Sequence, residues 1–127
     1  ICGEGWSHIA LVREGAEIRL FKHGTESKKI SFSEGLFSFK TPFIIGYTQT
    51  PHDLDTHYQG IIHSMSISSS ALYASNFIPE RQEVKTDTVL LWYLSEGEGS
   101  IVNSEVGTYE GNIDGATWVE ECPYIYQ

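Results

Sequence analysis

Two short apolar runs with a repeat of two residues, joined by a brief connection, constrain the fold most. In residues 7–13 apolar side chains alternate between two faces, and residues 17–22 repeat the alternation. This is the repeat of a β-strand, because successive side chains of a strand point to opposite faces. Gly15 lies between the runs and supplies turn chemistry, and His23-Gly24 ends the second run. The sequence therefore predicts a β-hairpin near the start of the chain.

The rest of the chain shows the same strand pattern and little helical periodicity. Further strands are predicted at residues 28–33, 43–47, 60–68, 89–94 and 115–119. One helical turn is predicted at residues 69–75, where a serine can cap the segment and alanine and leucine tolerate it. Gly and Pro recur between the predicted strands, which is typical of a β-sandwich or barrel. The length fits one domain, so we expect residues 1–127 to form a single all-β domain.

The charge of the chain is negative and unevenly distributed. The formal net charge is −9, and residues 80–127 hold ten acidic side chains against Arg81 and Lys85, a net of −8. The first 79 residues therefore carry only −1. A chain this acidic repels phosphate backbones and anionic lipids, so we expect no nucleic-acid partner and no membrane insertion. No apolar run is long enough to span a bilayer.

The first residues and the two cysteines bear on whether the chain is part of a larger polypeptide and on its cellular compartment. The chain opens on Ile-Cys-Gly, and we expect it to be part of a larger polypeptide. Cys2 and Cys122 lie too far apart in sequence for a zinc motif. A disulfide between them would staple the termini and stabilise the fold by roughly 4–5 kcal/mol in an oxidising compartment. Two unpaired thiols in a cytosolic protein are the alternative.

Several segments together resemble one family. Residues 6–13, WSHIALVR, and 18–24, IRLFKHG, are similar to the "W-x-H-x-A-x-V … L-Y-V-D-G" hairpin of laminin-G-like domains with the concanavalin A-like jelly-roll fold. Other segments resemble further family motifs: 43–47, 58–67, 71–79, 90–99 and 111–119. The resemblance implies an antiparallel β-sandwich of jelly-roll type, in a complete, permuted or partial version. It also implies that Trp6 and His8 are fold markers rather than a catalytic pair.

The order of these motifs departs from the family pattern. Residues 90–99 resemble what is normally the first strand, and the strands that would carry "F-T-I-x-A-W-V" are absent. Either the chain joins the back of one domain to the front of the next, or its last strands close the sheet in a permuted way. We expect the closed sandwich, because residues 118–126 carry enough apolar surface to fill a missing edge.

The candidate binding site is the polar connection at residues 48–58, TQTPHDLDTHY, with its flanking tyrosine. Its candidate ligand-binding residues are Tyr47, His52, His57 and Tyr58. Tyrosine rings can stack on the apolar face of a sugar, while carboxylates and amides bind its hydroxyl groups. A polar loop without a ligand is the alternative reading of the same residues.

The same connection could hold a metal. Asp53 and Asp55 alternate and offer oxygen ligands to calcium, whereas two histidines would favour a softer metal. At the family's "I-D-E" positions this chain has Ile62-His63-Ser64, so the acids expected there are missing. Any calcium site must therefore use Asp53, Asp55 or the C-terminal acids.

Catalysis has little support, and we predict that the protein is not an enzyme. Glycoside hydrolysis needs two carboxylates that flank the scissile bond. Glu96 and Glu98 are the candidate acids, but glycines interleave them at the end of a predicted strand. Catalytic motifs of the G-x-S-x-G, C-x-x-C and H-E-x-x-H types are absent. A glycoside hydrolase remains the least favoured hypothesis.

The favoured function is recognition of a glycan or glycoprotein, outside the cell or at its surface. This follows from the family resemblance, with the loop at residues 48–58 as its local support. The alternative is a protein–protein interaction or scaffolding module in a larger assembly in the cytoplasm.

Overall fold

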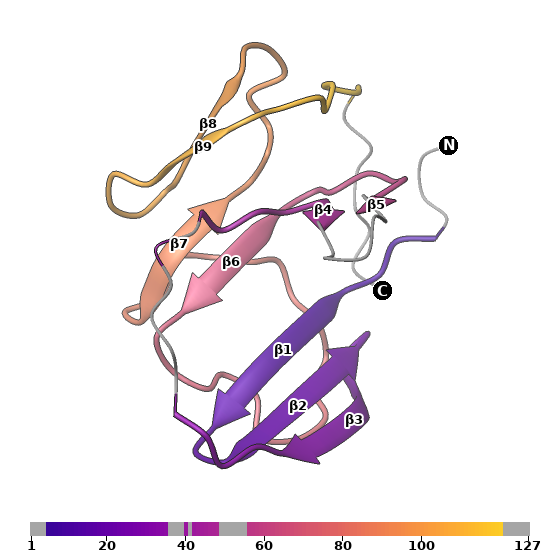
Figure 1. The fold of residues 1–127 in the computed structure, drawn as a ribbon, viewed down its shortest axis with the longest axis vertical. Helices are drawn as coiled ribbons and strands as arrows, with labels where there is room; N and C mark the ends of the chain where they lie inside the picture. The colour runs from indigo at the N-terminus through magenta and orange to yellow at the C-terminus, as the bar shows by residue number, and fades with distance from the viewer. Residues whose placement is uncertain (1–4, 36–39, 41, 49–55, 121–127) are drawn as a thin grey trace.

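A computed structural model describes residues 5–35, 40, 42–48 and 56–120 (Figure 1). These residues contain no helix and form only antiparallel strand pairs, which confirms the predicted all-β fold. The described strands are β1 (Ile9–Glu14), β2 (Glu17–Lys22), β3 (Thr25–Ser31), β4 (Tyr47–Thr48), β5 (Thr56–His57), β6 (Met65–Ser68), β7 (Thr88–Trp92), β8 (Ile101–Asn103) and β9 (Glu110–Asn112).

The predicted hairpin is confirmed as β1 and β2, and β3 extends it to a three-stranded sheet. The β1–β2 loop has a positive φ of 58° at Gly15, the first of its two residues, as in a type II′ turn. The β2–β3 loop has positive φ at both residues, 51° at His23 and 76° at Gly24, as in a type I′ turn. Both turns match the twist of the strands they join, so neighbouring residues are enough to specify this sheet.

The predicted helical turn at residues 69–75 is wrong. The described residues there form bends, because the serines at the start of the segment bond to Asp87 instead of to a helical backbone. The Ser69 N–H donates to the Asp87 carbonyl at 2.9 Å, and the Ser70 hydroxyl donates to the Asp87 carboxylate. Serine side chains commonly compete with helix formation in this way.

Three predicted strands are shorter than expected or missing. Residues 43–47 form a strand only at Tyr47, after Gly46 with a φ of 81°, and residues 115–119 form none, after Gly115 with a φ of 77°. Positive φ interrupts the extended backbone that a strand needs. Residues 60–68 form a strand only from Met65, because the partner strand β7 ends opposite it.

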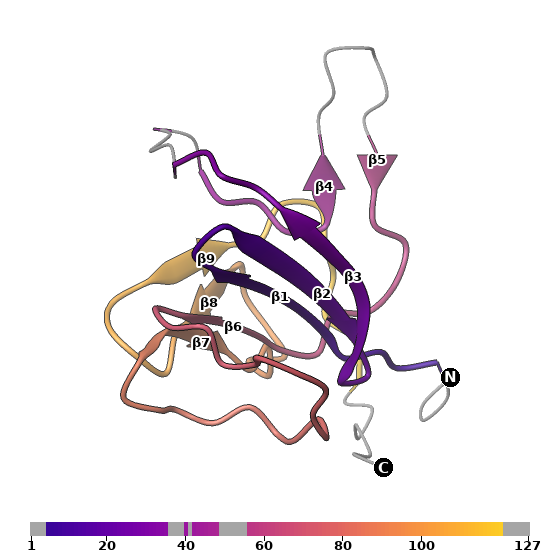
Figure 2. The same cartoon turned by 90° about the horizontal axis from the view of Figure 1, so that it is seen from below.

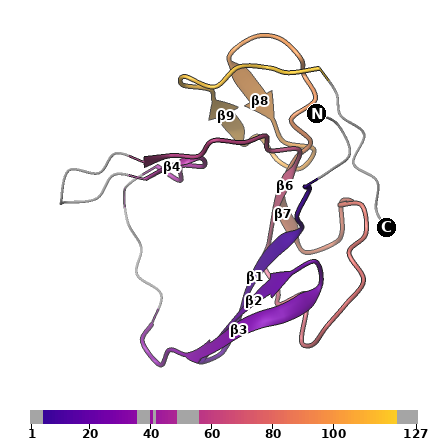
Figure 3. The ribbon, with the colours of Figure 1, turned by 90° about the vertical axis from the view of Figure 1, so that its right-hand side faces the viewer.

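β6 and β7 lie beside β1 in the same layer as the three-stranded sheet (Figures 1 and 3). Trp6 lies just before β1 and His63 just before β6. Their rings meet edge to face, with centroids 5.9 Å apart. Residues 69–87 cross one side of this layer (Figure 2). Trp6 therefore packs against the segment that leads into β6.

The buried core lies under this crossing segment and around β7. Phe21 of β2 is fully buried, and its ring centroid lies 5.4 Å from that of Phe77 and 6.2 Å from that of Tyr73. Leu91 of β7 is also fully buried. The remaining buried apolar side chains described are Val12, Leu90 and Val102.

The expectation that residues 118–126 close the sheet stays a prediction, because most of that segment lies outside the described residues. β8 and β9 form a two-stranded sheet of their own and pair with none of β1–β3. Their neighbour is β7, since the Leu91 carbonyl accepts a hydrogen bond from the Glu105 N–H at 2.9 Å. Residues 121–126 lie outside the described residues, as do Cys2 and Cys122, whose pairing stays open.

Candidate ligand-binding site

The candidate site lies on the hairpin formed by β4 and β5, which projects from the rest of the fold (Figure 2). Tyr47 pairs with His57 and Thr48 with Thr56 in an antiparallel register. The base of the hairpin is closed by a hydrogen bond of 2.7 Å from the Tyr58 N–H to the Gly46 carbonyl. The connection between residues 48 and 56 is therefore held at both ends.

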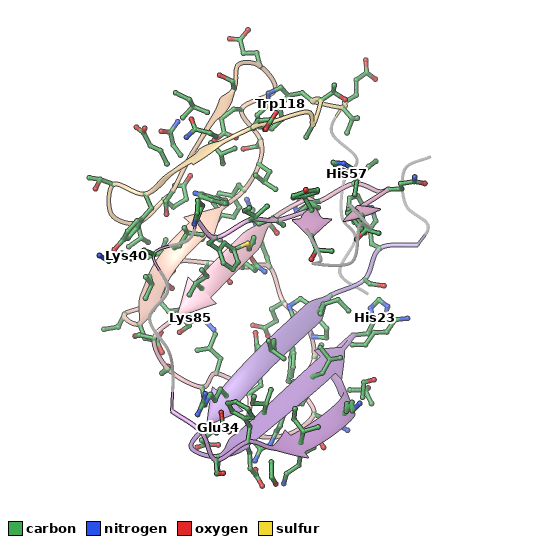
Figure 4. The ribbon with its side chains drawn as sticks, viewed as in Figure 1. His23, Glu34, Lys40, His57, Lys85 and Trp118 are labelled. Atoms are coloured by element: carbon green, nitrogen blue, oxygen red, sulfur yellow. The ribbon has the colours of Figure 1, made fainter. Side chains whose placement is uncertain are left out.

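Two of the predicted ligand-binding residues come together at this base, and a third follows them in the chain. The rings of Tyr47 and His57 pack across the two strands with centroids 4.9 Å apart and an angle of 36° between their planes. The next residue, Tyr58, is 61% exposed. Figure 4 labels His57 beside β5. An imidazole and two phenol rings on an exposed hairpin offer flat apolar surfaces together with hydrogen-bonding groups.

The fourth predicted ligand residue and the predicted metal ligands lie outside the described residues. These are His52, Asp53 and Asp55. Among the residues that the structure does describe, no group of three or more His, Cys, Asp or Glu side chains could hold a metal ion. At the family's acidic positions, His63 instead contacts Trp6 and lies 3.2 Å from the Ser64 hydroxyl through its Nδ1. The calcium site on Asp53 and Asp55 thus stays a prediction.

The two candidate catalytic acids lie in the connection between β7 and β8. Glu96 Oε1 accepts a hydrogen bond of 2.9 Å from the Asn103 N–H and so holds the end of β8. Glu98 is exposed to solvent. The Trp118 indole donates to the nearby Gly99 carbonyl at 2.8 Å, in the region labelled in Figure 4. These contacts give Glu96 a structural role in the turn.

The structure also shows an open polar hollow that the sequence did not predict. Glu26, Ala74, Ser75 and Asn76 line it. Asn76 Oδ1 accepts a hydrogen bond of 2.8 Å from the Glu26 N–H, which joins β3 to the crossing segment. Residues 50 positions apart build this hollow, so local patterns carried no signal for it.

A network of charges lies beside the hollow and centres on Arg19. The Arg19 guanidinium lies 2.5 Å from Glu17, 3.7 Å from Glu14 and 3.9 Å from Glu26, and donates to the Ala74 carbonyl at 2.7 Å. Lys29 also pairs with Glu17, at 2.6 Å. The hydrogen bond from Lys29 and that from Arg19 lower the pKa of Glu17. Arg19 therefore fastens the crossing segment to the sheet.

His8 lies against the aromatic core rather than in a reactive site. Its ring meets those of Phe77 and Tyr73 edge to face, with centroids 5.6 Å and 6.5 Å away. Its buried Nδ1 has no hydrogen-bond partner among the residues that the structure describes. Burial first, and the charge of His23 second, lower the pKa of His8.

We expect this arrangement to make the stability depend on pH. Unfolded His8 takes up a proton near its usual pKa of about 6.5, whereas the folded protein resists that proton. The stabilising contribution is therefore complete above pH 6.5 and is lost as the pH falls toward the lowered pKa. Urea unfolding at pH 7.5 and 5.5 should show a lower midpoint at pH 5.5.

The control for this prediction is His8→Gln, which removes the titration. The lowered pKa values of Glu17 and Asp87 keep these carboxylates ionised across the same range, so they add no slope. An equal drop in midpoint for the native protein and His8→Gln would assign the pH dependence to other groups.

The strand pairing defines the class of the protein as an antiparallel all-β domain. Residues 3–76, more than half of the chain, match the Laminin_G_3 family model, the concanavalin A-like lectin/glucanases superfamily. The chain belongs to this family, as the sequence motifs predicted. No curated protein and no solved structure matches the chain. Laminin-G-like domains are generally non-catalytic.

The described residues include no helix that is long and apolar enough to cross a membrane.

Proposed function

We propose that the domain is a non-catalytic binding module that recognises a glycan or glycoprotein through the β4–β5 hairpin. The observation that carries this proposal is the cross-strand pair of Tyr47 and His57 beside the exposed Tyr58. A sugar ring presents C–H groups that stack on an aromatic face and hydroxyl groups that bond to phenol and imidazole. His52 lies in the connection of the same hairpin and is included in the proposed site.

A glycan array tests the proposal directly. We expect the native protein to give a selective hit, and Tyr58→Ala to weaken binding to that glycan about tenfold, the loss typical of one stacked contact residue. Tyr109→Ala is the matched control, because Tyr109 is 56% exposed but lies next to β9. A blank array with folded protein, or equal losses for the two variants, would refute the proposed site.

Calcium is proposed as a cofactor of this site, held by Asp53 and Asp55. The support is the chemistry of two alternating carboxylates in a connection whose ends are paired at Thr48 and Thr56. We expect millimolar calcium to give a measurable heat in titration calorimetry, and the Asp53→Asn, Asp55→Asn double variant to abolish it.

Asp114→Asn is the control for the calcium experiment, since it removes one carboxylate from another part of the chain. Glycan binding that persists in a chelator, together with no heat from calcium, would remove the metal from the proposal. The aromatic contacts would then remain as the whole site.

A glycan ligand places the domain outside the cell or at its surface, as part of a larger polypeptide. The same proposal makes a Cys2–Cys122 disulfide chemically reasonable, because disulfides persist in oxidising compartments.

A further inference from the structure

Gly60 lies in a bend shortly after β5, where the Tyr58 ring approaches the backbone closely. A Cβ built on Gly60 would lie 2.6 Å from the Tyr58 Oη, 2.7 Å from its Cζ and 2.8 Å from its Cε1. Non-bonded carbon atoms pack at about 3.5–4.0 Å, so these distances are far too short. The hydroxyl-bearing end of the Tyr58 ring therefore occupies the space where a side chain at position 60 would begin.

The backbone at position 60 does not itself require a glycine. The φ of Gly60 lies outside the left-handed region, whereas Gly46 at the base of the same hairpin has a φ of 81°. An alanine could adopt the backbone of Gly60 without strain, but not that of Gly46. Glycine at position 60 is therefore needed for the space that it leaves to the Tyr58 ring.

The other end of the Tyr58 side chain is held as well. The Tyr58 N–H donates to the Gly46 carbonyl at 2.7 Å, which fixes the backbone from which the ring projects. The ring nevertheless belongs to a residue that is 61% exposed. A side chain that is exposed but already restrained loses little conformational freedom when a ligand stacks on it, and this strengthens binding.

We propose that Gly60 is a positioning residue of the glycan site, which keeps the Tyr58 ring in one orientation for the ligand. This inference rests on the proposed function and adds to it the residue that orients one of its rings. An alanine at position 60 would force the ring to swing away. Since a tyrosine side chain turns about two bonds, it can do so while the backbone stays in place.

The affinity for the glycan that scores highest on the array tests the proposal. We expect Gly60→Ala to weaken this binding about three- to tenfold, because the ligand must then order a loose ring. The midpoint of urea unfolding should stay close to the native one. Gly35→Ala is the matched control, since a Cβ on Gly35 meets no atom of the described residues within 4 Å and its φ also lies outside the left-handed region.

A double-mutant cycle separates positioning of the ring from a purely structural role of Gly60. In the Tyr58→Ala background, Gly60→Ala should weaken glycan binding no further, because no ring is left to orient. An equal loss in the native and Tyr58→Ala backgrounds would show that Gly60 acts through the backbone, and would overturn the proposal.

The position of the ring can also be measured without any glycan. An aromatic ring shifts the NMR resonances of protons that lie close to it. The Gly60 Hα resonances should therefore be displaced in the native protein and return toward ordinary glycine values in Tyr58→Ala. Undisplaced resonances in the native protein would contradict the contact between the ring and Gly60.

These experiments distinguish a failure of the positioning role from a failure of the proposed function. A blank array with folded native protein overturns both. Selective binding that Gly60→Ala leaves unchanged overturns the positioning role alone, and the proposed function stands. Selective binding that Tyr58→Ala and Gly60→Ala each weaken, with no added loss in the double variant, supports both.

Discussion

Gly24→Ala is expected to destabilise the fold by at least about 3 kcal/mol, a large share of the stability of a domain this size. Two costs combine. Gly24 has a φ of 76°, which costs an alanine about 1–2 kcal/mol. An added Cβ would also lie 1.8 Å from the carbonyl oxygen of Phe77, so the crossing segment would have to move. That movement would break the 2.9 Å hydrogen bond from the Phe77 N–H to the Gly24 carbonyl.

Gly15→Ala is the matched control, because it shares the backbone cost without the collision. Gly15 has a φ of 58°, and a Cβ there meets no atom within 4 Å. We expect urea unfolding to give a loss of only about 1–2 kcal/mol for this variant. Equal losses for the two variants would show that the crossing segment does not lie against the β2–β3 turn.

The second large effect is expected for Phe21→Ala, with a loss of about 3–5 kcal/mol. Phe21 is fully buried between the sheet and the rings of Phe77 and Tyr73, and these neighbours cannot close the cavity without leaving their own contacts. Phe43→Ala is the control, since Phe43 is 69% exposed and should lose less than about 1 kcal/mol. Chemical denaturation measures both. A difference of less than about 1 kcal/mol would contradict this description of the core.

The parts of the fold that were predicted correctly are those specified by neighbouring residues. The β1–β2 hairpin follows from alternation plus Gly15, and both are visible in a dozen residues. The helical turn at residues 69–75 was predicted wrongly because its competitor, Asp87, lies far along the chain. Apolar content alone suggested strands at 43–47 and 115–119, where glycine backbone conformation prevents them.

The candidate site shows the same division. Tyr47, His57 and Tyr58 could be named from the sequence because aromatic residues in a polar connection stand out. Their pairing across β4 and β5 could not, since it depends on the register of two very short strands. The cluster around Arg19 could not be predicted from the sequence at all. Its contact with Ala74 spans 55 residues and has no local pattern.

The two tight turns of β1–β3 have a consequence for the order of folding. Each turn closes a loop of two residues, so the meander can form quickly and at small entropic cost. The rings that cover it arrive later, because Tyr73 and Phe77 are about fifty residues further along the chain. During that interval both faces of the nascent sheet are open to water and to other chains. The time between turn formation and the arrival of Phe77 is therefore when the chain is most exposed to misassembly.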